Sequence, residues 1–457
     1  MIPAQDVVDR ILQAAARHGR ADETIVIVTD RAEASLRWAG NSMTTNGVST
    51  TRSTAVIAVV YRGSAAHVGA VRSSDVDPAA LASLVESAQD AALGAPAARD
   101  SAALLTDSGV PDDWNEPVPQ TGADVFADVA ASLAAGFGRA DRLYGFAHHV
   151  VETTFLATST GVRRRFTQPT GSVEVNAKRN GASAWAGVST PWFADVPVDA
   201  MLLDLSTRLD WSKRSVELPA GRYETLMPPS TVADMMIYLG WSMDGRGAQE
   251  GRTALSAPGG GTRVGEKLTD LGLTMYSDPF VPGLECSPFV HTASGSERMS
   301  VFDNGMDITR VDWIRDGTIS GLAYPRAAAA EFGAEVAVPA DNLLMTGGTS
   351  DLAGMVAATE RGLLLTTLWY IRTVDPTTLL LTGLTRDGVY LIEDGEITAA
   401  VNNFRFNESP LDLLRRATEA GKPQTTLPRE WSDWATRAVM PTLRIPDFHM
   451  SSVSQAQ

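Results

Sequence analysis

Metal ligands and thiols are scarce in this chain. Across 457 residues there is one cysteine, Cys286, and six histidines. A single thiol cannot form an intramolecular disulfide, which fits a reducing compartment. None of the histidines stands in an HxxxH, HExxH or HxH arrangement, and none occurs between His149 and His291. The adjacent His148 and His149 lie in an apparent strand, where neighbouring side chains point to opposite faces, so we expect no shared metal site there.

Basic residues and long apolar runs are also lacking. The chain has 38 Lys and Arg against 54 Asp and Glu, a net charge of −16. Nonspecific affinity for nucleic acid comes from basic patches that neutralise phosphate, so direct nucleic-acid binding is disfavoured. The most apolar strand-like run, residues 55–61, is far shorter than the ~20 residues that span a bilayer. The first residues lack the basic and apolar regions of a signal peptide. We therefore expect a cytoplasmic protein without a membrane segment.

The remaining composition is that of an ordinary globular protein. It is 44% hydrophobic and 20% charged, and its length is too great for one core, so two domains are expected. In the first half, predicted strands are grouped rather than alternating singly with helices, which is typical of an α+β fold. We expect a mixed α/β domain at residues 1–215 and, at residues 216–457, a domain dominated by antiparallel sheet with helices.

Local signals place several elements. The N-terminal residues have the periodicity of an amphipathic helix. Residues 42–72 are rich in β-formers and are interrupted by two turn signals, Asn46-Gly47 and Arg62-Gly63. A helix should follow Pro229, with Ser230 or Thr231 as its cap. Its apolar residues fall at helical spacing and predict a buried face, namely Val232, Met235, Met236, Leu239 and Met243.

The segment 361–406 carries the strongest β signal. Apolar runs at 362–370, 377–384 and 389–392 are separated by polar turn residues, and another run follows at 396–401. This pattern predicts an antiparallel meander. Asp394-Gly395 predicts a two-residue type I′ hairpin, because both central residues of that turn need positive φ. Asp316-Gly317 predicts a second hairpin within residues 311–323.

The same region resembles the TldD/PmbA family of bacterial metallopeptidases, also called modulators of DNA gyrase. The resemblance rests on ordered agreement over a long span: residues 221–229 before a helix, 342–348, 351–361, the string GVYLIEDGEI at 388–397, and Asn407 before a Leu-rich helix. It covers most of residues 215–445 and continues more weakly through the N-terminal half.

The resemblance implies where zinc would be bound in catalytic members. There, an HExxxH motif lies on the helix after the Pro/Ser/Thr turn, with a further Cys ligand near the C-terminus. The two imidazoles hold the ion, the glutamate carboxylate handles the proton, and an open position lets zinc-bound water become hydroxide near neutral pH. In this chain Gly240 and Gly245 take the histidine places, Trp241 takes the glutamate place, and no cysteine follows Cys286. The chain is therefore similar to the TldE/PmbA branch. That similarity implies no cofactor in this chain and a heterodimer with a zinc-bearing TldD-like partner.

The resemblance therefore implies that this chain contributes a remodelled groove for extended, unfolded peptides. The zinc-bearing partner would cleave these peptides. A strand edge could bind such peptides through main-chain hydrogen bonds with little dependence on sequence. The candidate groove residues, some of which could instead contact the partner subunit, are Gly240, Trp241, Asp244, Gly245, Arg246, Glu250, Tyr370 and Arg372.

Two other functions are compatible with the sequence. One is a stand-alone regulatory protein that binds peptides or a protein partner through a pseudo-active site without cleaving them. The other is an independent hydrolase with a relocated site, for which Cys286 and His291 would be the thiol nucleophile and its base. The non-functional alternative for the candidate groove residues is that they form a helix end with an ordinary charged surface.

Overall fold

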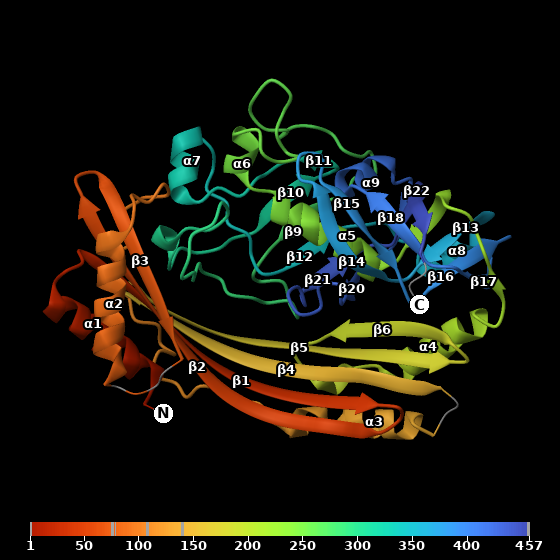
Figure 1. The fold of residues 1–457 in the computed structure, drawn as a ribbon, viewed down its shortest axis with the longest axis horizontal. Helices are drawn as coiled ribbons and strands as arrows, with labels where there is room; N and C mark the ends of the chain where they lie inside the picture. The colour runs from red at the N-terminus through yellow and green to blue at the C-terminus, as the bar shows by residue number, and fades with distance from the viewer. Residues whose placement is uncertain (1, 75–76, 78, 107–108, 139–140, 455–457) are drawn as a thin grey trace.

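Three β-sheets carry the fold, shown in Figure 1. The computed structural model describes residues 2–74, 77, 79–106, 109–138 and 141–454. The N-terminal half forms one long, curved sheet, and the C-terminal half lies over the concave face of that sheet. The architecture is α+β and mostly sheet, as the sequence predicted.

The first sheet has six antiparallel strands in the order β3-β2-β1-β4-β5-β6. Their bounds are β1 Glu23–Ala39, β2 Met43–Arg62, β3 Ala65–Ser73, β4 Arg142–Thr158, β5 Arg163–Arg179 and β6 Ala182–Ser189. The α-helices that the described residues form beside it are α1 Ala4–His18, α2 Ala80–Gly94, α3 Ala127–Gly136 and α4 Val198–Trp211, with short 3-10 helices at Ala123–Phe126 and Phe193–Asp195.

The two faces of the first sheet have different partners, because successive side chains of a strand point to opposite sides. On one face, Val26 packs in a cluster with α1 and α2, and Trp38 packs in a cluster with α3 and α4. On the other face, Ile25 and Ile27 share a cluster with Phe302 of the C-terminal half. The helices therefore cover the convex face and leave the concave face to the C-terminal half.

The C-terminal half contains two further sheets. The small sheet has the order β11-β10-β9-β12-β21-β20, with β9 Met275–Ser277, β10 Val311–Arg315, β11 Thr318–Ile319, β12 Leu343–Met345, β20 Gln424–Thr426 and β21 Ala438–Met440. The large sheet has the order β14-β15-β18-β22-β8-β13-β16-β17-β7, and β19 pairs with β22. Its strands are β7 Ser215–Val216, β8 Gly221–Met227, β13 Arg361–Leu365, β14 Leu368–Asp375, β15 Leu380–Thr385, β16 Val389–Glu393, β17 Glu396–Val401, β18 Phe404–Glu408, β19 Glu419–Ala420 and β22 Leu443–Val453.

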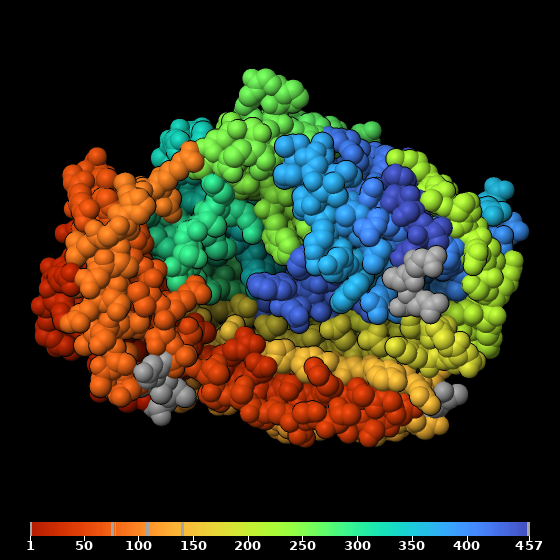
Figure 2. All heavy atoms as spheres, in the orientation of Figure 1, coloured from red at the N-terminus to blue at the C-terminus, as the bar shows by residue number. Residues whose placement is uncertain are grey.

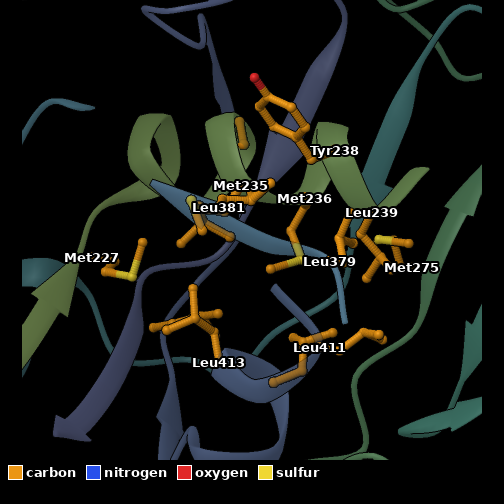
Figure 3. Close-up of a cluster of buried hydrophobic side chains, with 14 of the residues drawn as sticks. Met227, Met235, Met236, Tyr238, Leu239, Met275, Leu379, Leu381, Leu411 and Leu413 are labelled. Carbon is orange, nitrogen blue, oxygen red and sulfur yellow. The ribbon is translucent and has the colours of Figure 1, made fainter. Parts of the chain in front are cut away.

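Helix α5, Pro229–Ser242, lies at the centre of the C-terminal core. The predicted apolar face is buried, and neighbouring positions are buried too, so the helix is enclosed on nearly every side. Figure 3 shows Met236 and Leu239 of α5 among leucines of two other segments, Leu379 and Leu411. The remaining helices of this half are α6 Gly245–Gln249, α7 Arg326–Phe332, α8 Leu352–Ala357 and α9 Pro410–Arg416.

Both predicted two-residue hairpins are confirmed. Asp394 and Gly395 have φ of 51° and 82° between β16 and β17, and Asp316 and Gly317 have φ of 48° and 76° between β10 and β11. Positive φ at both central positions is the requirement of a type I′ turn. These turns were predictable because their conformation is set by the two residues themselves.

The predicted meander over 361–406 is wrong in its pairing. β14 pairs with β15 and β16 pairs with β17, but β15 pairs on its other side with β18, and β16 pairs with β13. Four strands therefore separate β15 from β16 in the large sheet. Three of the predicted runs correspond to β15, β16 and β17, but the run 362–370 is divided between β13 and β14, which are not neighbours in the large sheet. The partners of these strands come from distant parts of the chain.

Other local expectations also need correction. The Asn46-Gly47 pair does not form the predicted turn, because β2 runs through it. The turn lies instead at Gly40 and Asn41, with φ of 60° and 66°. Ser230 and Thr231 do not cap α5: both lie within the helix, and Thr231 Oγ1 donates to the carbonyl of Pro228. The division at residue 215 remains a prediction. Among the residues that the structure describes, no helix combines the length and apolar character needed to cross a membrane.

Candidate functional site

A cleft separates the concave face of the first sheet from the C-terminal half. It consists of four adjoining cavities of about 100 to 330 Å³ each. Every one of them is bordered by Asp341, Arg437 or both. Figure 2 shows the surface hollowed where the C-terminal half meets the strands of the first sheet. We use the name "the cleft" for these four cavities together.

Arg437 ties three segments together at the centre of the cleft. Its Nε donates to the Glu285 carbonyl at 3.1 Å, and its Nη2 donates to the Pro169 carbonyl at 3.1 Å and to the Thr170 hydroxyl. Its Nη1 lies 3.1 Å from Asp341 Oδ2. Pro169 and Thr170 belong to β5, whereas Glu285 and Asp341 belong to the C-terminal half. The guanidinium therefore joins the first sheet to the wall opposite it.

The first sheet contributes a charged floor to the cleft. His148 Nε2 lies 2.8 Å from Glu33 Oε1, and Arg31 contacts both Glu33 and Glu152 at 3.2 and 3.1 Å. The His148 imidazole and the Arg31 guanidinium help to hold the pKa of Glu33 below its usual range, against the effect of burial. The neighbouring His149 points to the opposite face and pairs with Thr121, as the strand alternation predicted. The floor is thus a linked set of opposite charges.

One cavity of the cleft places His291 beside Glu152 and Asp341. The enclosing protein lowers the pKa of His291 and raises that of Asp341, whose side chain nevertheless remains 62% exposed to solvent in the cavity. Gln168 Nε2 donates to Asp341 Oδ2 at 3.4 Å. This cavity therefore combines an imidazole whose neutral form is favoured with two carboxyl groups that water can reach.

The end of α5 borders the cleft on the side of the C-terminal half. Gly240 and Trp241 line a cavity there, together with Trp434. Trp241 is 39% exposed and packs edge-on against Trp431 at 4.7 Å between ring centroids. The Gly240 carbonyl accepts a hydrogen bond of 3.1 Å from Arg298 Nη1. Of the eight candidate groove residues, these two lie on the cleft wall.

Asp244 and Gly245 have structural roles instead. Asp244 Oδ1 caps α6 by accepting from the Gly247 N–H at 2.5 Å, and burial raises the pKa of its carboxyl. A Cβ at Gly245 would stand 2.1 Å from the Tyr324 ring, so only glycine fits. α5 ends at Ser242 and α6 begins at Gly245, so Gly240 and Gly245 lie on different helices rather than on the single helix implied by the resemblance.

Arg246 and Glu250 belong to an ion-pair network away from the cleft. Arg246 is buried, its Nη2 donates to Glu331 Oε2 at 2.5 Å, and its guanidinium lies over Phe332. Glu250 pairs with Arg99 from the N-terminal half. These two residues connect α6 to α7 and to the N-terminal half, and they are not part of the cleft lining.

Tyr370 and Arg372 lie on β14, an edge strand of the large sheet. Both hold the carboxylate of Glu430, which accepts from the N–H groups of Tyr370 and Ile371 at 2.8 and 3.0 Å and from Arg372 Nη1 at 3.1 Å. The two residues therefore act together, although neither lines the four cavities of the cleft.

Cys286 and His291 do not form a nucleophile and base. Cys286 is 1% exposed in a cluster with Val290 and Ile308, whereas His291 faces the cleft. Burial raises the pKa of the Cys286 thiol to about 12, so the reactive thiolate is not accessible near neutral pH. The thiol hydrolase is therefore disfavoured.

The residues at the implied zinc positions do not fit the metal. Gly240, Trp241 and Gly245 offer no imidazole, thiolate or carboxylate. Within residues 2–454, less the short undescribed gaps, no three His, Cys, Asp or Glu side chains gather as a metal site. The end of α5 instead presents an indole and a backbone carbonyl.

Sequence reasoning missed the centre of the cleft. Glu152, Asp341, Trp434 and Arg437 come from segments far apart in the chain and stand in no local motif. Three of them are charged, as is 20% of the chain, and Trp434 is one of ten tryptophans, so residue type alone did not distinguish them. Their proximity depends on the packing of the two halves.

Comparison with known proteins identifies the family. Residues 220–452, more than half of the chain, match the model of the PmbA/TldA metallopeptidase C-terminal domain. The chain therefore belongs to the PmbA/TldD family of metallopeptidases. No curated protein matches it in sequence.

Solved structures share the fold over the whole chain. TldE from Thermococcus kodakarensis superposes with a TM-score of 0.79 at 14% identity, covering 97% of this chain and 99% of that one. A proposed modulator of DNA gyrase from Thermotoga maritima gives a TM-score of 0.74 at 15% identity, covering 98% and 100%. Another, from Bacteroides thetaiotaomicron, gives 0.77 at 14% identity, covering 99% and 100%. The chain thus shares the fold of these three structures.

Proposed function

We propose that this chain is the zinc-less, non-catalytic subunit of a two-subunit TldD/TldE-type peptidase, acting in the cytoplasm with a TldD-like partner that carries the zinc. The end of α5 carries the proposal: at the cleft wall it presents Gly240 and Trp241, where catalytic relatives would present histidine and glutamate. Among the solved structures that share the fold, one is named TldE, which supports the assignment.

In this proposal the cleft receives short, unfolded peptides. Its floor is a sheet face with paired charges, and its walls carry exposed aromatic side chains, Trp241 and Trp434. Such a surface can contact an extended backbone and apolar side chains without reading one sequence. The chain would thereby help to choose which peptides reach the partner's zinc.

The test combines the purified chain with an HExxxH-bearing homologue from the same genome. We expect no stoichiometric zinc in this chain by elemental analysis, a stable heterodimer by light scattering, and cleavage of unstructured peptides only by the mixture. Zinc bound one to one by this chain, together with peptide cleavage in the absence of any partner, would refute the proposal. Peptide binding without complex formation or cleavage would instead favour the stand-alone binding protein.

A variant tests the role of the cleft wall. Trp241→Ala in the complex should raise KM for peptides severalfold while leaving the partner's zinc content unchanged. Leu203→Ala is the matched control, because Leu203 is an exposed apolar residue on α4, on the other side of the first sheet. Equal KM values for both variants would remove Trp241 from the peptide site.

A further inference from the structure

The Glu430 carboxylate occupies a compact anion site on the edge of the large sheet. Although Glu430 is ionisable, its side chain is only 8% exposed, and three donors from β14 converge on it: the N–H groups of Tyr370 and Ile371 and the Arg372 guanidinium. We call these three donors the β14 nest. Charge-assisted hydrogen bonds of this kind are about twice as strong as neutral ones.

The backbone of β14 is bent to form this nest. Tyr370 has a φ of 55°, a left-handed conformation that costs a non-glycine residue roughly 1 kcal/mol or more. The pairing of β14 with β15 is irregular between Trp369 and Arg372, so the strand bulges there. Bulges and left-handed residues turn successive N–H groups toward one point, which is how backbone nests bind anions.

The nest lies beside exposed surface rather than under a closed core. Tyr370 and Val374 are 58% and 56% exposed, and the Arg372 guanidinium lies 4.3 Å above the Tyr370 ring. Among the residues that the structure describes, β14 is the last strand of its sheet, and none of them forms a strand on its outer edge. An extended chain could therefore approach the nest from outside.

The loop that supplies Glu430 also forms a wall of the cleft. Residues 427–437 join β20 to β21 and include Trp434 and Arg437, which line the cleft. At the start of this loop, the Glu430 N–H donates to Asp234 Oδ1 of α5 at 3.0 Å. Occupation of the β14 nest by Glu430 thus fixes one end of the 427–437 loop.

We propose that the β14 nest is a carboxylate-binding site, held in this structure by Glu430, that takes the C-terminal carboxylate of an extended peptide when Glu430 withdraws. A terminal carboxylate has the same charge, the same two acceptor oxygens and the same planar geometry as the Glu430 side chain. Two N–H groups and a guanidinium are the donors by which proteins capture peptide carboxylates. This inference rests on the proposed function, because it names the end of the peptide that the chain would hold.

Glu430 competes with the peptide as a tethered ligand, at an effective concentration on the order of millimolar. Wild-type protein should therefore bind a free peptide carboxylate weakly. Removing the negative charge at residue 430 should expose the site and strengthen binding. Peptides that end in an amide should gain nothing, because they cannot accept from three donors.

The experiment compares an unstructured decapeptide with its C-terminal amide by fluorescence anisotropy. In Glu430→Gln we expect the free acid to bind about tenfold more tightly than in wild type, equivalent to one charge-assisted hydrogen bond, with no gain for the amide. Adding Arg372→Ala should abolish this preference. Glu266→Gln is the control, since Glu266 pairs with Arg263 and Arg415 instead of with the donors of the β14 nest.

A second variant tests the nest without a peptide. In Glu430→Ala, acetate should raise the Tm relative to chloride at equal ionic strength, because acetate can replace the missing carboxylate, whereas wild type should show no difference. If Glu430→Gln binds the free acid and the amide equally well, the β14 nest does not bind the peptide's C-terminal carboxylate, but the proposed function is unaffected. If neither wild type nor the variants bind either peptide, even in the presence of the partner, both the proposed function and the proposal for the β14 nest are refuted. If acetate has no effect on Glu430→Ala, the nest is not an anion site.

Discussion

Replacing Arg437 by methionine removes the guanidinium that connects β5 to the opposite wall of the cleft. Methionine keeps much of the apolar stem but donates no hydrogen bond. The carbonyls of Pro169 and Glu285 and the Thr170 hydroxyl lose their donor, at about 1 kcal/mol each. The ion pair to Asp341 adds only about 0.5 kcal/mol, because that carboxylate is 62% exposed. We therefore expect Arg437→Met to lower the free energy of unfolding by about 3.5 kcal/mol.

Urea denaturation followed by tryptophan fluorescence measures this loss. Arg315→Met is the matched control: Arg315 is 64% exposed and pairs with Asp312 on the surface, so its loss should cost under about 1 kcal/mol. Arg437→Lys should recover only part of the stability, because an ammonium cannot reproduce the planar fork. If Arg437→Met is no more destabilising than Arg315→Met, Arg437 does not hold the two halves together.

Three further outcomes follow from buried groups and turns. Burial raises the pKa of Asp234 well above its ordinary value, so the native state keeps a proton that the unfolded chain loses above about pH 4. The stability of Asp234→Asn relative to wild type should therefore increase as the pH rises from 4 to 7. A difference in unfolding free energy that stays constant over this pH range, measured by urea denaturation, would contradict the prediction. Because burial raises the pKa of Cys286 to about 12, iodoacetamide at pH 8 should label it in urea and spare it in the native chain; equal rates by mass spectrometry would disprove its protection. Gly395→Ala should cost about 1–3 kcal/mol in thermal or urea unfolding, since φ is 82° and the added Cβ would stand 2.7 Å from the Ala357 carbonyl; an unchanged midpoint would show that the turn adapts.

Several elements of the C-terminal half were readable from local sequence. The Asp-Gly hairpins and the apolar helix after Pro229 are decided by short-range effects: permitted φ at the turn and helical spacing of apolar residues. The meander failed because strand partners are not a local property. β15 meets β18, and β16 meets β13, through contacts that depend on how the whole large sheet assembles.

The candidate site divides in the same way. Gly240 and Trp241 were named as candidates because they follow a recognisable turn and helix, and the structure places both at the border of the cleft. Asp244 and Arg246 were named for the same proximity in sequence, but a break after Ser242 turns them into a cap and a buried ion pair. Tyr370 was named as a groove residue, and only the structure shows its donors meeting Glu430 from a distant loop.

By itself, the sequence determined the absence of imidazole and thiol ligands at the implied zinc positions, the α+β composition and the resemblance to the PmbA/TldD family, because these depend on residue identity and local order. Tertiary structure alone decided that Glu152, Asp341 and Arg437 share one cleft, and that Glu430 fills the β14 nest. The physical reason is that both sites form where segments far apart in the chain pack together, about 60 residues apart at the β14 nest. A side chain's neighbours across such a contact leave no mark in its local sequence.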